Sequence, residues 1–315
     1  MHFAIIARVL GMLLIIFSLS MLTPVLVALL YGENTSHTFF IAFAITFLVG
    51  LIFWLPSRGS KGELRTRDGF VVTVFFWLVL SSFGSLPLML SEALQLNFID
   101  ALFESISGLT TTGATVIAGL DNLPKSILYY RQQLQWLGGI GIVVIAVAIL
   151  PMLGVGGMQI YRAETPGPMK DSKLTPRITE TANVLFRIYL CLTIACALAY
   201  WGAGMSGFDA ISHSFSTVSI GGFSTHDASI GFFDNSAIMA ICCFFMIIAG
   251  LNFALHFHAW HSLRPSMYWA DPEARLYLFL LLVGAIITCC YLYYSGTFDR
   301  NESIRQGAFQ LISIM

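Results

Sequence analysis

The sequence has 315 residues, of which 57% are hydrophobic and only 10% are charged, and its formal net charge at pH 7 is −1. Because a soluble domain usually carries about 25% charged residues, this composition excludes an ordinary soluble protein. It predicts an all-α polytopic membrane protein surrounded by lipid. The net charge does not indicate partners, because membrane orientation depends on where the charges lie. We expect no nucleic acid as a partner.

Seven apolar segments are long enough to cross a membrane as helices, because one span needs about 20 apolar residues. They cover residues 3–30, 37–56, 69–91, 127–153, 181–204, 235–260 and 275–296. The first segment carries Arg8 and has no small-residue cleavage site before Tyr31. We therefore expect it to be a retained helix and not a removed signal peptide.

The charged residues between these segments are distributed asymmetrically. Basic residues follow the second, fourth and sixth spans: Arg58, Lys61, Arg65, Arg67, Arg162, Lys170, Lys173, Arg177, Arg187, Arg264 and Arg275. Acidic residues gather in the other connections: Glu33, Asp100, Asp121, Asp209, Asp227 and Asp234. Because cytoplasmic connections carry an excess of Lys and Arg, the pattern predicts that the N-terminus is cytoplasmic.

Two polar segments, 100–115 and 209–224, lie between apolar spans and resemble each other at a constant offset. The matched pairs are Asp100 with Asp209, Ala101 with Ala210, Ser105 with Ser214, Ser107 with Ser216, and Gly113 with Gly222. The first half of each segment favours a short helix, and the second half favours extended backbone with one glycine of free φ. We interpret each as a re-entrant pore loop between two spans. A plain outer loop is the alternative, and the common register argues against it.

This repeat divides the chain into four parts. We expect two N-terminal transmembrane helices in residues 1–67, a first helix–pore loop–helix unit in 68–157, a second unit in 158–265, and a truncated third unit in 266–315 that ends in its pore helix. Alignment of Ser313 with Ser107 and Ser216 places the end of the sequence one residue before a third extended segment. The sequence is therefore expected to be a fragment of a longer protein.

A pore loop of this kind favours a dehydrated monovalent cation. Non-helical backbone at membrane depth is tolerated only where protein buries it or where it lines a wet cavity. The pore-helix C-terminus would direct partial negative charge toward the membrane centre, and carbonyl oxygens of the following strand would replace the hydration shell of the ion. Thr110 and Ser219 would add a hydroxyl at the inner end. No ring of carboxylates is present, which argues against a divalent-cation pore.

The fourth span opens with polar side chains that are costly in a membrane unless they are satisfied. These are Arg131, Gln132, Gln133 and Gln135, which we expect to bind neighbouring pore helices or loops. Gly138, Gly139 and Gly141 follow them and allow close helix packing or a bend. Glu104 and His213 occupy equivalent positions in the two polar segments, where a hydrogen bond that holds the pore helix is expected.

Three histidines near the inner end of the sixth span, His256, His258 and His261, support a different class of function. His258 and His261 could share a helix face and bind a metal or haem, as in a membrane-embedded oxidoreductase. A juxtamembrane polar helix end is the simpler interpretation. An absorption spectrum of the purified protein separates the two.

The repeated unit, the single-glycine segments Leu109–Thr115 and Val218–Ser224, the run Gln135–Gly141 and the two extra helices in front resemble the Trk/Ktr/HKT superfamily of potassium transporters. Within it the chain is most similar to the bacterial Trk-type potassium uptake membrane subunits (TrkH-like). The resemblance covers essentially the whole chain. It implies potassium uptake across the bacterial inner membrane, with rubidium as a surrogate ion and without enzymatic activity.

The resemblance also implies a site. Potassium would bind the backbone carbonyls of Thr111, Thr112, Ile220 and Gly221, flanked by Thr110, Gly113, Ser219 and Gly222. Four such strands would surround one pore, so two strands alone are not expected to conduct. A sodium-permeable pore is the alternative; in related plant transporters a serine at the first filter glycine is associated with sodium, so Gly113 favours potassium.

The family's assembly provides the remaining expectations. The resemblance implies a homodimer with a cytoplasmic nucleotide-binding regulatory subunit (TrkA-like), which the inner loops could contact. The basic inner loops do not indicate this by themselves, since they already follow from the membrane orientation. Symport with another ion and channel-like conduction are both compatible with the sequence.

Overall fold

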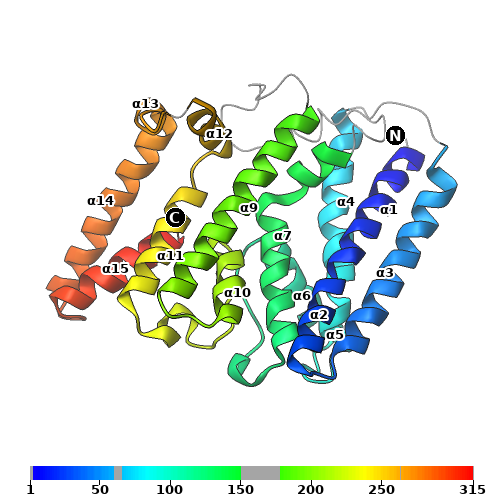
Figure 1. Cartoon of the computed structure of the whole chain (residues 1–315), viewed down its shortest axis with the longest axis horizontal. Coiled ribbons are helices and arrows are strands. Elements are labelled where there is room, and N and C mark those ends of the chain that lie inside the picture. The colour runs from blue at the N-terminus through cyan, green and yellow to red at the C-terminus, as the bar shows by residue number, and fades with distance from the viewer. Residues whose placement is uncertain (1–2, 60–65, 150–177, 263, 315) are drawn as a thin grey trace.

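The computed structural model describes residues 3–59, 66–149, 178–262 and 264–314. Within these residues the regular elements are all helices, and the predicted all-α membrane fold is confirmed (Figure 1). The chain begins with α1 (Phe3–Ser20), α2 (Leu22–Tyr31) and α3 (Ser36–Ser57). Helices α1 and α3 pack so closely that a Cβ atom added to Gly11 would lie only 2.7 Å from the Gly50 carbonyl oxygen. Small residues permit this approach between membrane helices.

Two groups of helices follow, and each contains a long helix, a 12-residue helix, a short 3₁₀ helix and a further helix in this order. The first contains α4 (Thr66–Gly84), α5 (Leu86–Leu90), α6 (Phe98–Leu109), the short 3₁₀ helix η1 (Leu120–Asn122) and α7 (Lys125–Ile149). The second contains α9 (Ile178–Gly202), α10 (Gly207–Val218), η3 (Ser229–Phe233), α11 (Ser236–Ala249) and α12 (Phe253–Ser262). Helix α10 begins and ends 109 residues after α6. The sequence repeat is therefore also a repeat of helix boundaries.

A last group consists of α13 (Met267–Ala270), α14 (Pro272–Tyr294) and α15 (Arg300–Ile314). Figure 1 shows the long helices side by side, from α1 and α3 at one edge to α14 at the other, with the shorter α6 and α10 between them. The predicted boundary between residues 157 and 158 lies outside the described residues. The one at residues 67 and 68 falls in the first turn of α4.

Five helical segments of the described chain are long and apolar enough to cross a membrane: Phe3–Tyr31, Ser36–Ser57, Val71–Leu90, Asn183–Gly202 and Pro272–Tyr294. They correspond to five of the seven predicted spans. The fourth prediction, residues 127–153, corresponds to α7, whose described part ends at Ile149 and bends at Gly141 (φ +59°, ψ −171°). Only glycine adopts this backbone conformation readily.

The sixth prediction, one continuous span over residues 235–260, is wrong. Helix α11 is 14 residues long and ends at Ala249, and α12 starts at Phe253. The break follows Gly250, where an added Cβ would overlap the Tyr277 hydroxyl of α14. Glycine has a low helix propensity, and its missing side chain admits the tyrosine. Apolar composition predicted the length of the segment but not the break beside Tyr277 of α14.

Different helix ends and loops lie at the upper and the lower end of the long helices. The end of α3, the start of α4, and α12 and α13 lie at the upper end of Figure 1, whereas the connections from α2 to α3 and from α14 to α15 lie at the lower end. Most basic residues used to predict the orientation fall in 60–65 and 150–177, outside the described residues. A cytoplasmic N-terminus therefore stays a prediction.

Candidate functional site

The helices α6 and α10 start in the same way. The Asn97 side chain accepts a hydrogen bond from the Asp100 backbone N–H (2.9 Å), and the Ser206 hydroxyl accepts one from the Asp209 N–H (3.1 Å). Such caps satisfy a backbone donor that the first helical turn leaves without a partner. The acidic residue in each first turn also complements the positive end of the helix dipole. Local sequence thus fixes where both helices begin.

The C-terminal ends of α6 and α10 also match. The Thr112 N–H donates to the Ser107 carbonyl (2.9 Å), and the Gly221 N–H donates to the Ser216 carbonyl (2.8 Å). With the neighbouring shorter bonds these form a Schellman motif, in which a left-handed residue ends the helix. After both motifs the chain continues without helix through residues 112–117 and 221–225, which we call strand 1 and strand 2.

The left-handed residues are unusual in type. Thr111 has φ +54° and Ile220 has φ +52°, and two residues later Gly113 and Gly222 have φ +78° and +86°. A positive φ in a β-branched residue is a genuine outlier and costs about 1–2 kcal/mol. Glycine, the usual residue at this position of a helix end, is absent in both copies. Strain retained at equivalent positions points to function.

Strand 1 and strand 2 approach each other at their glycines. A Cβ atom added to Gly113 would overlap the Gly221 carbonyl oxygen and would lie 3.4 Å from Gly222 Cα. A hollow of about 510 Å³ adjoins both strands and is lined by residues that include Thr112, Gly113, Gly221 and Gly222, with Gln310 of α15. Predicted site residues from both units, together with a residue of α15, therefore line the same hollow.

Helix α7 separates the ends of α6 and α10. An added Cβ at Gly138 would overlap the Leu109 carbonyl oxygen at the end of α6, and one at Gly139 would lie 2.5 Å from Ser219 Cβ at the end of α10. The glycine run predicted to allow close packing or a bend does both, since Gly141 follows with its non-helical backbone. Both helix ends thereby rest directly on the α7 backbone.

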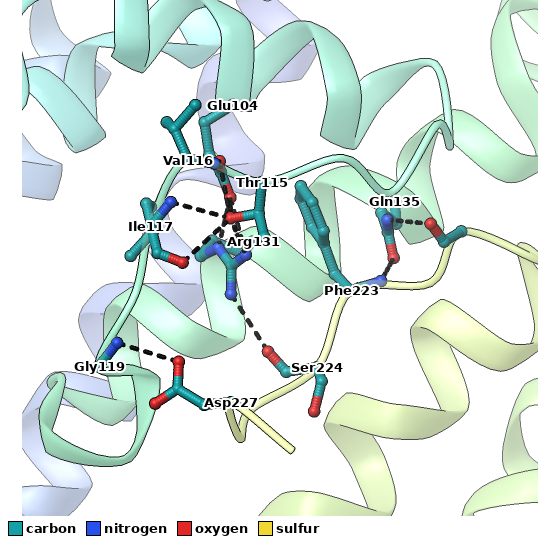
Figure 2. Close-up of polar contacts among 11 residues, drawn as sticks. Glu104, Thr115, Val116, Ile117, Gly119, Arg131, Gln135, Phe223, Ser224 and Asp227 are labelled. Atoms are coloured by element: carbon teal, nitrogen blue, oxygen red, sulfur yellow. Dashed lines mark hydrogen bonds and ion pairs between the residues drawn. The ribbon is translucent and has the colours of Figure 1, made fainter. Parts of the chain in front are cut away.

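A buried ion pair joins α7 to α6 (Figure 2). Arg131 and Glu104 have side chains that are 0% exposed, and Arg131 Nη2 lies 2.7 Å from Glu104 Oε1. The Thr115 hydroxyl donates to the same carboxylate (2.9 Å), and so does the Val116 backbone N–H (3.1 Å). Because an unpaired charge is costly in a membrane, these bonds make the position of strand 1 depend on α7.

The same face of α7 reaches strand 2. Arg131 Nη1 donates to the Ser224 carbonyl (3.1 Å), and its guanidinium lies 4.4 Å from the centre of the Phe223 ring. Gln135 Nε2 donates to the Gly221 carbonyl (2.6 Å), while its Oε1 accepts from the Phe223 N–H (3.0 Å). Figure 2 shows Arg131 and Gln135 in contact with the second strand at two places.

Helices α6 and α10 use different chemistry at equivalent positions. His213 stands where α6 has Glu104; it is 1% exposed, and its Nε2 shares a hydrogen bond with the Thr225 hydroxyl (3.1 Å). Thr225 in turn donates to Asp209 Oδ1 (2.8 Å). The expectation that both side chains hold their pore helices in place is met by contacts with the following strand.

Two of the polar side chains of α7 depart from expectation. Gln133 Nε2 donates to the Ser20 carbonyl (2.8 Å), and its Oε1 accepts from the Thr23 hydroxyl (2.8 Å). It therefore contacts the first span and not a pore helix or loop, because it faces the opposite side of α7. Gln132 is fully buried, and its amide has no hydrogen-bond partner among the described residues.

The hydroxyls expected at the inner end of the site bond to their own helices. Thr110 Oγ1 donates to the Ile106 carbonyl (2.7 Å) and shares a second hydrogen bond with Thr112 Oγ1 (2.8 Å). Ser219 Oγ donates to the Ser216 carbonyl (3.2 Å). The hydrogen of each hydroxyl is thus directed back along the helix. An oxygen lone pair is left on each side chain.

The loops that follow strand 1 and strand 2 also touch. His226 Nδ1 hydrogen-bonds Asp121, and the Asp227 carboxylate accepts from the Gly119 N–H (2.9 Å). The His226 hydrogen bond holds the pKa of the Asp121 carboxyl below its usual value. Both contacts join residues that follow the first strand to residues that follow the second.

Of the three histidines, the structure describes the side chain of His256. Its Nδ1 shares a hydrogen bond with the Tyr268 hydroxyl (2.8 Å), and its Nε2 pairs with the Ile248 carbonyl (3.0 Å). Both ring nitrogens therefore bond protein groups, one in α13 and one across the break in α11. The side chains of His258 and His261 lie outside the described residues.

The sequence did not identify Thr115, Phe223 and Ser224 as partners of the α7 side chains. The repeat carried a partial signal, because Thr115 and Ser224 are 109 residues apart like the other matched pairs. Polarity at the start of the fourth span indicated that Arg131 and Gln135 need partners. Which strand each one reaches depends on the packing of α7 between the units.

Comparisons with known proteins place these features in context. A family model described as TrkH, cation transport protein, matches residues 35–295. Curated relatives include the Trk system potassium uptake proteins TrkH of Halomonas elongata, 57% identical over 315 residues, and of Escherichia coli K12, 51% identical over 315 residues. Each match covers 100% of this chain and 65% of the relative, so the chain spans about 65% of the length of these relatives.

A solved structure agrees with these matches. The crystal structure of the potassium transporter TrkH from Vibrio parahaemolyticus aligns with a TM-score of 0.88 at 50% sequence identity. The alignment covers 100% of this chain and 64% of that chain.

Proposed function

The chain belongs to the TrkH family of cation transport proteins, and on this basis we propose that it takes part in potassium uptake across the bacterial inner membrane. Its relatives with 57% and 51% identity are named potassium uptake proteins. The paired geometry of strands 1 and 2 is the single observation that supports a potassium site in this part of the chain. Two equivalent strained turns, each followed by a glycine strand, meet at one hollow.

We propose that potassium binds the backbone carbonyls of Thr111, Thr112, Ile220 and Gly221. A carbonyl ring replaces the hydration shell of a monovalent cation without a charged ligand. The Gly221 oxygen already accepts from Gln135 and offers the ion its second lone pair. The C-terminal ends of α6 and α10 contribute partial negative charge beside the site.

The flanking residues have supporting roles in this proposal. Gly113 and Gly222 supply positive φ and leave no side chain between the strands. The hydroxyls of Thr110 and Ser219 stand at the inner end of the site. In the working protein two further strands complete the ring, the N-terminus is cytoplasmic, and a homodimer binds a cytoplasmic nucleotide-binding regulatory subunit.

Rubidium uptake into proteoliposomes tests the proposal, with the protein expressed from its full natural reading frame together with its regulatory subunit. Gly113→Ser and Gly222→Ser should each reduce uptake or redirect it to sodium, because each adds a side chain at a positive φ. Gly202→Ser is the matched control, since an added Cβ there meets nothing within 4 Å. Uptake that is indifferent to both filter substitutions would refute the proposed site.

An absorption spectrum of the same purified protein tests the oxidoreductase alternative. A Soret band or stoichiometric iron would replace ion uptake by redox chemistry at His256, His258 and His261. We expect neither, because both nitrogens of His256 already bond protein groups.

A further inference from the structure

Helix α7 belongs to the first unit, yet it holds the strand of the second. Arg131 and Gln135 are four residues apart and therefore share one face of the helix. Arg131 bonds Glu104 and Thr115 on the side of strand 1 and Ser224 on the side of strand 2. Its contacts thus join the outer parts of both strands through one rigid group.

Gln135 holds strand 2 on both sides of its glycine. The Gly221 carbonyl and the Phe223 N–H belong to the two residues that flank Gly222, and the single amide of Gln135 bonds both. An added Cβ on Gly221 would come closest to the Gln135 amide group. The amide therefore fixes the direction of the Gly221 carbonyl, which is one of the proposed potassium ligands.

We propose that Arg131 and Gln135 are positioning residues that set the separation of strands 1 and 2, and that they thereby determine selectivity for potassium over sodium. This inference rests on the proposed function. Neither residue is itself an ion ligand. Their effect passes through the carbonyls that they orient and through the spacing between the two strands.

The chemistry of the two side chains suits this role. A guanidinium presents its donors in a fixed planar fork, whereas a lysine ammonium is a compact charge on a flexible stem. Arg131 Nη1 and Nη2 bond Ser224 and Thr115 respectively, so the fork fixes the distance between these two residues. Selectivity depends on the size of the carbonyl cage and on the strength of its field. Both change when one strand moves relative to the other.

The test compares Gln135→Leu and Arg131→Lys with two controls on the same helix. Gln133→Leu removes an amide of the same kind that bonds the first span, and Tyr130→Phe removes a buried hydroxyl that bonds the Gly84 carbonyl (2.8 Å). Arg131→Lys keeps the charge opposite Glu104, which avoids leaving a buried carboxylate without a counter-charge. Each variant is assayed for rubidium uptake in competition with potassium and with sodium.

We expect Gln135→Leu and Arg131→Lys to lower the ratio of potassium to sodium competition by about tenfold, which corresponds to about 1.4 kcal/mol. The two controls should leave the ratio at the parent value. A purely structural role would reduce the amount of folded protein or the uptake rate without moving this ratio. Gln135→Glu, which keeps the acceptor but loses the donor to Gly221, should fall between the parent and Gln135→Leu.

The outcomes separate this inference from the proposed function. If Gly113→Ser and Gly222→Ser alter uptake but the α7 variants leave the ion ratio unchanged, the positioning role is refuted and the filter stands. If Gln133→Leu shifts the ratio as much as Gln135→Leu, general disturbance of α7 is the cause and the inference is equally overturned. A parent protein without rubidium uptake would refute the proposed function itself.

Discussion

The contact between α7 and the end of α10 gives a prediction whose magnitude follows from distances. In Gly139→Ala the new Cβ would lie 2.5 Å from Ser219 Cβ, 2.6 Å from the Tyr189 hydroxyl and 2.8 Å from Ser219 Cα. Carbon atoms do not approach a Cβ within 3.0 Å in real structures. The end of α10 must therefore move away from α7 by about 0.5 Å, and Tyr189 must move as well.

The energetic cost has two parts. Overpacking of a tight contact costs about 1–3 kcal/mol. Movement of Tyr189 also threatens the bond from its hydroxyl to the Trp136 carbonyl (3.0 Å), which contributes about 0.5–1.5 kcal/mol. We expect a lower temperature of thermal unfolding. We also expect weaker rubidium uptake, because Ser219 directly precedes Ile220 and the proposed site.

A second substitution separates these two effects. Tyr189→Phe removes the hydroxyl that the new methyl group meets, so the double variant should regain part of the lost thermal stability. The Ser219 contact stays, and the uptake defect should therefore persist. Gly207→Ala is the matched control, because an added Cβ there meets nothing within 4 Å. Parent-like uptake and unfolding temperature in Gly139→Ala would show that α10 does not rest on this glycine, and our account of the helix ends would be wrong.

Three further predictions concern strain, the helix break and the loops that follow strands 1 and 2. Ile220→Gly should relieve the left-handed strain and raise thermal stability by about 1 kcal/mol; a drop in unfolding temperature would contradict this. Gly250→Ala should lower the temperature of thermal unfolding, and adding Tyr277→Phe should restore it; a double variant as unstable as Gly250→Ala would contradict the role of the Tyr277 contact. The pKa of the Asp121 carboxyl is lowered from 3.8 by its hydrogen bond to His226. This bond therefore stabilises the folded protein at pH values above 3.8, and the stabilisation is lost as the pH falls through the lowered pKa. Asp121→Asn should therefore lower the unfolding temperature at pH 7 but not below that pKa, and a pH-independent difference would contradict the assignment.

Much of the candidate site could be predicted from the sequence because its signals are local. A cap residue, a short amphipathic helix and a glycine two residues after the helix end recur with one offset, and each depends on neighbours within a few positions. The positive φ of Gly113 and Gly222 follows from this pattern. The positive φ of Ile220 does not, since a β-branched residue disfavours it.

The sixth span illustrates the opposite case. Its apolar residues satisfied the length criterion for one helix, yet the helix ends at Ala249. Tyr277, which leaves no room for a side chain at Gly250, is 27 residues away and belongs to another helix. Periodicity and hydropathy describe a segment by itself, so they cannot register a side chain that arrives from elsewhere.

By itself, the sequence determined the membrane class, the number of apolar segments, the paired polar segments and the need for partners on α7, because composition and spacing are properties of the chain. The tertiary structure alone decided that Arg131 pairs with Glu104, that Gln135 reaches across to strand 2, and that Gln133 turns to the first span. These choices depend on how α7 is rotated between its neighbours. The partners available to a buried polar group depend on where packing places it, and packing is a property of the whole fold.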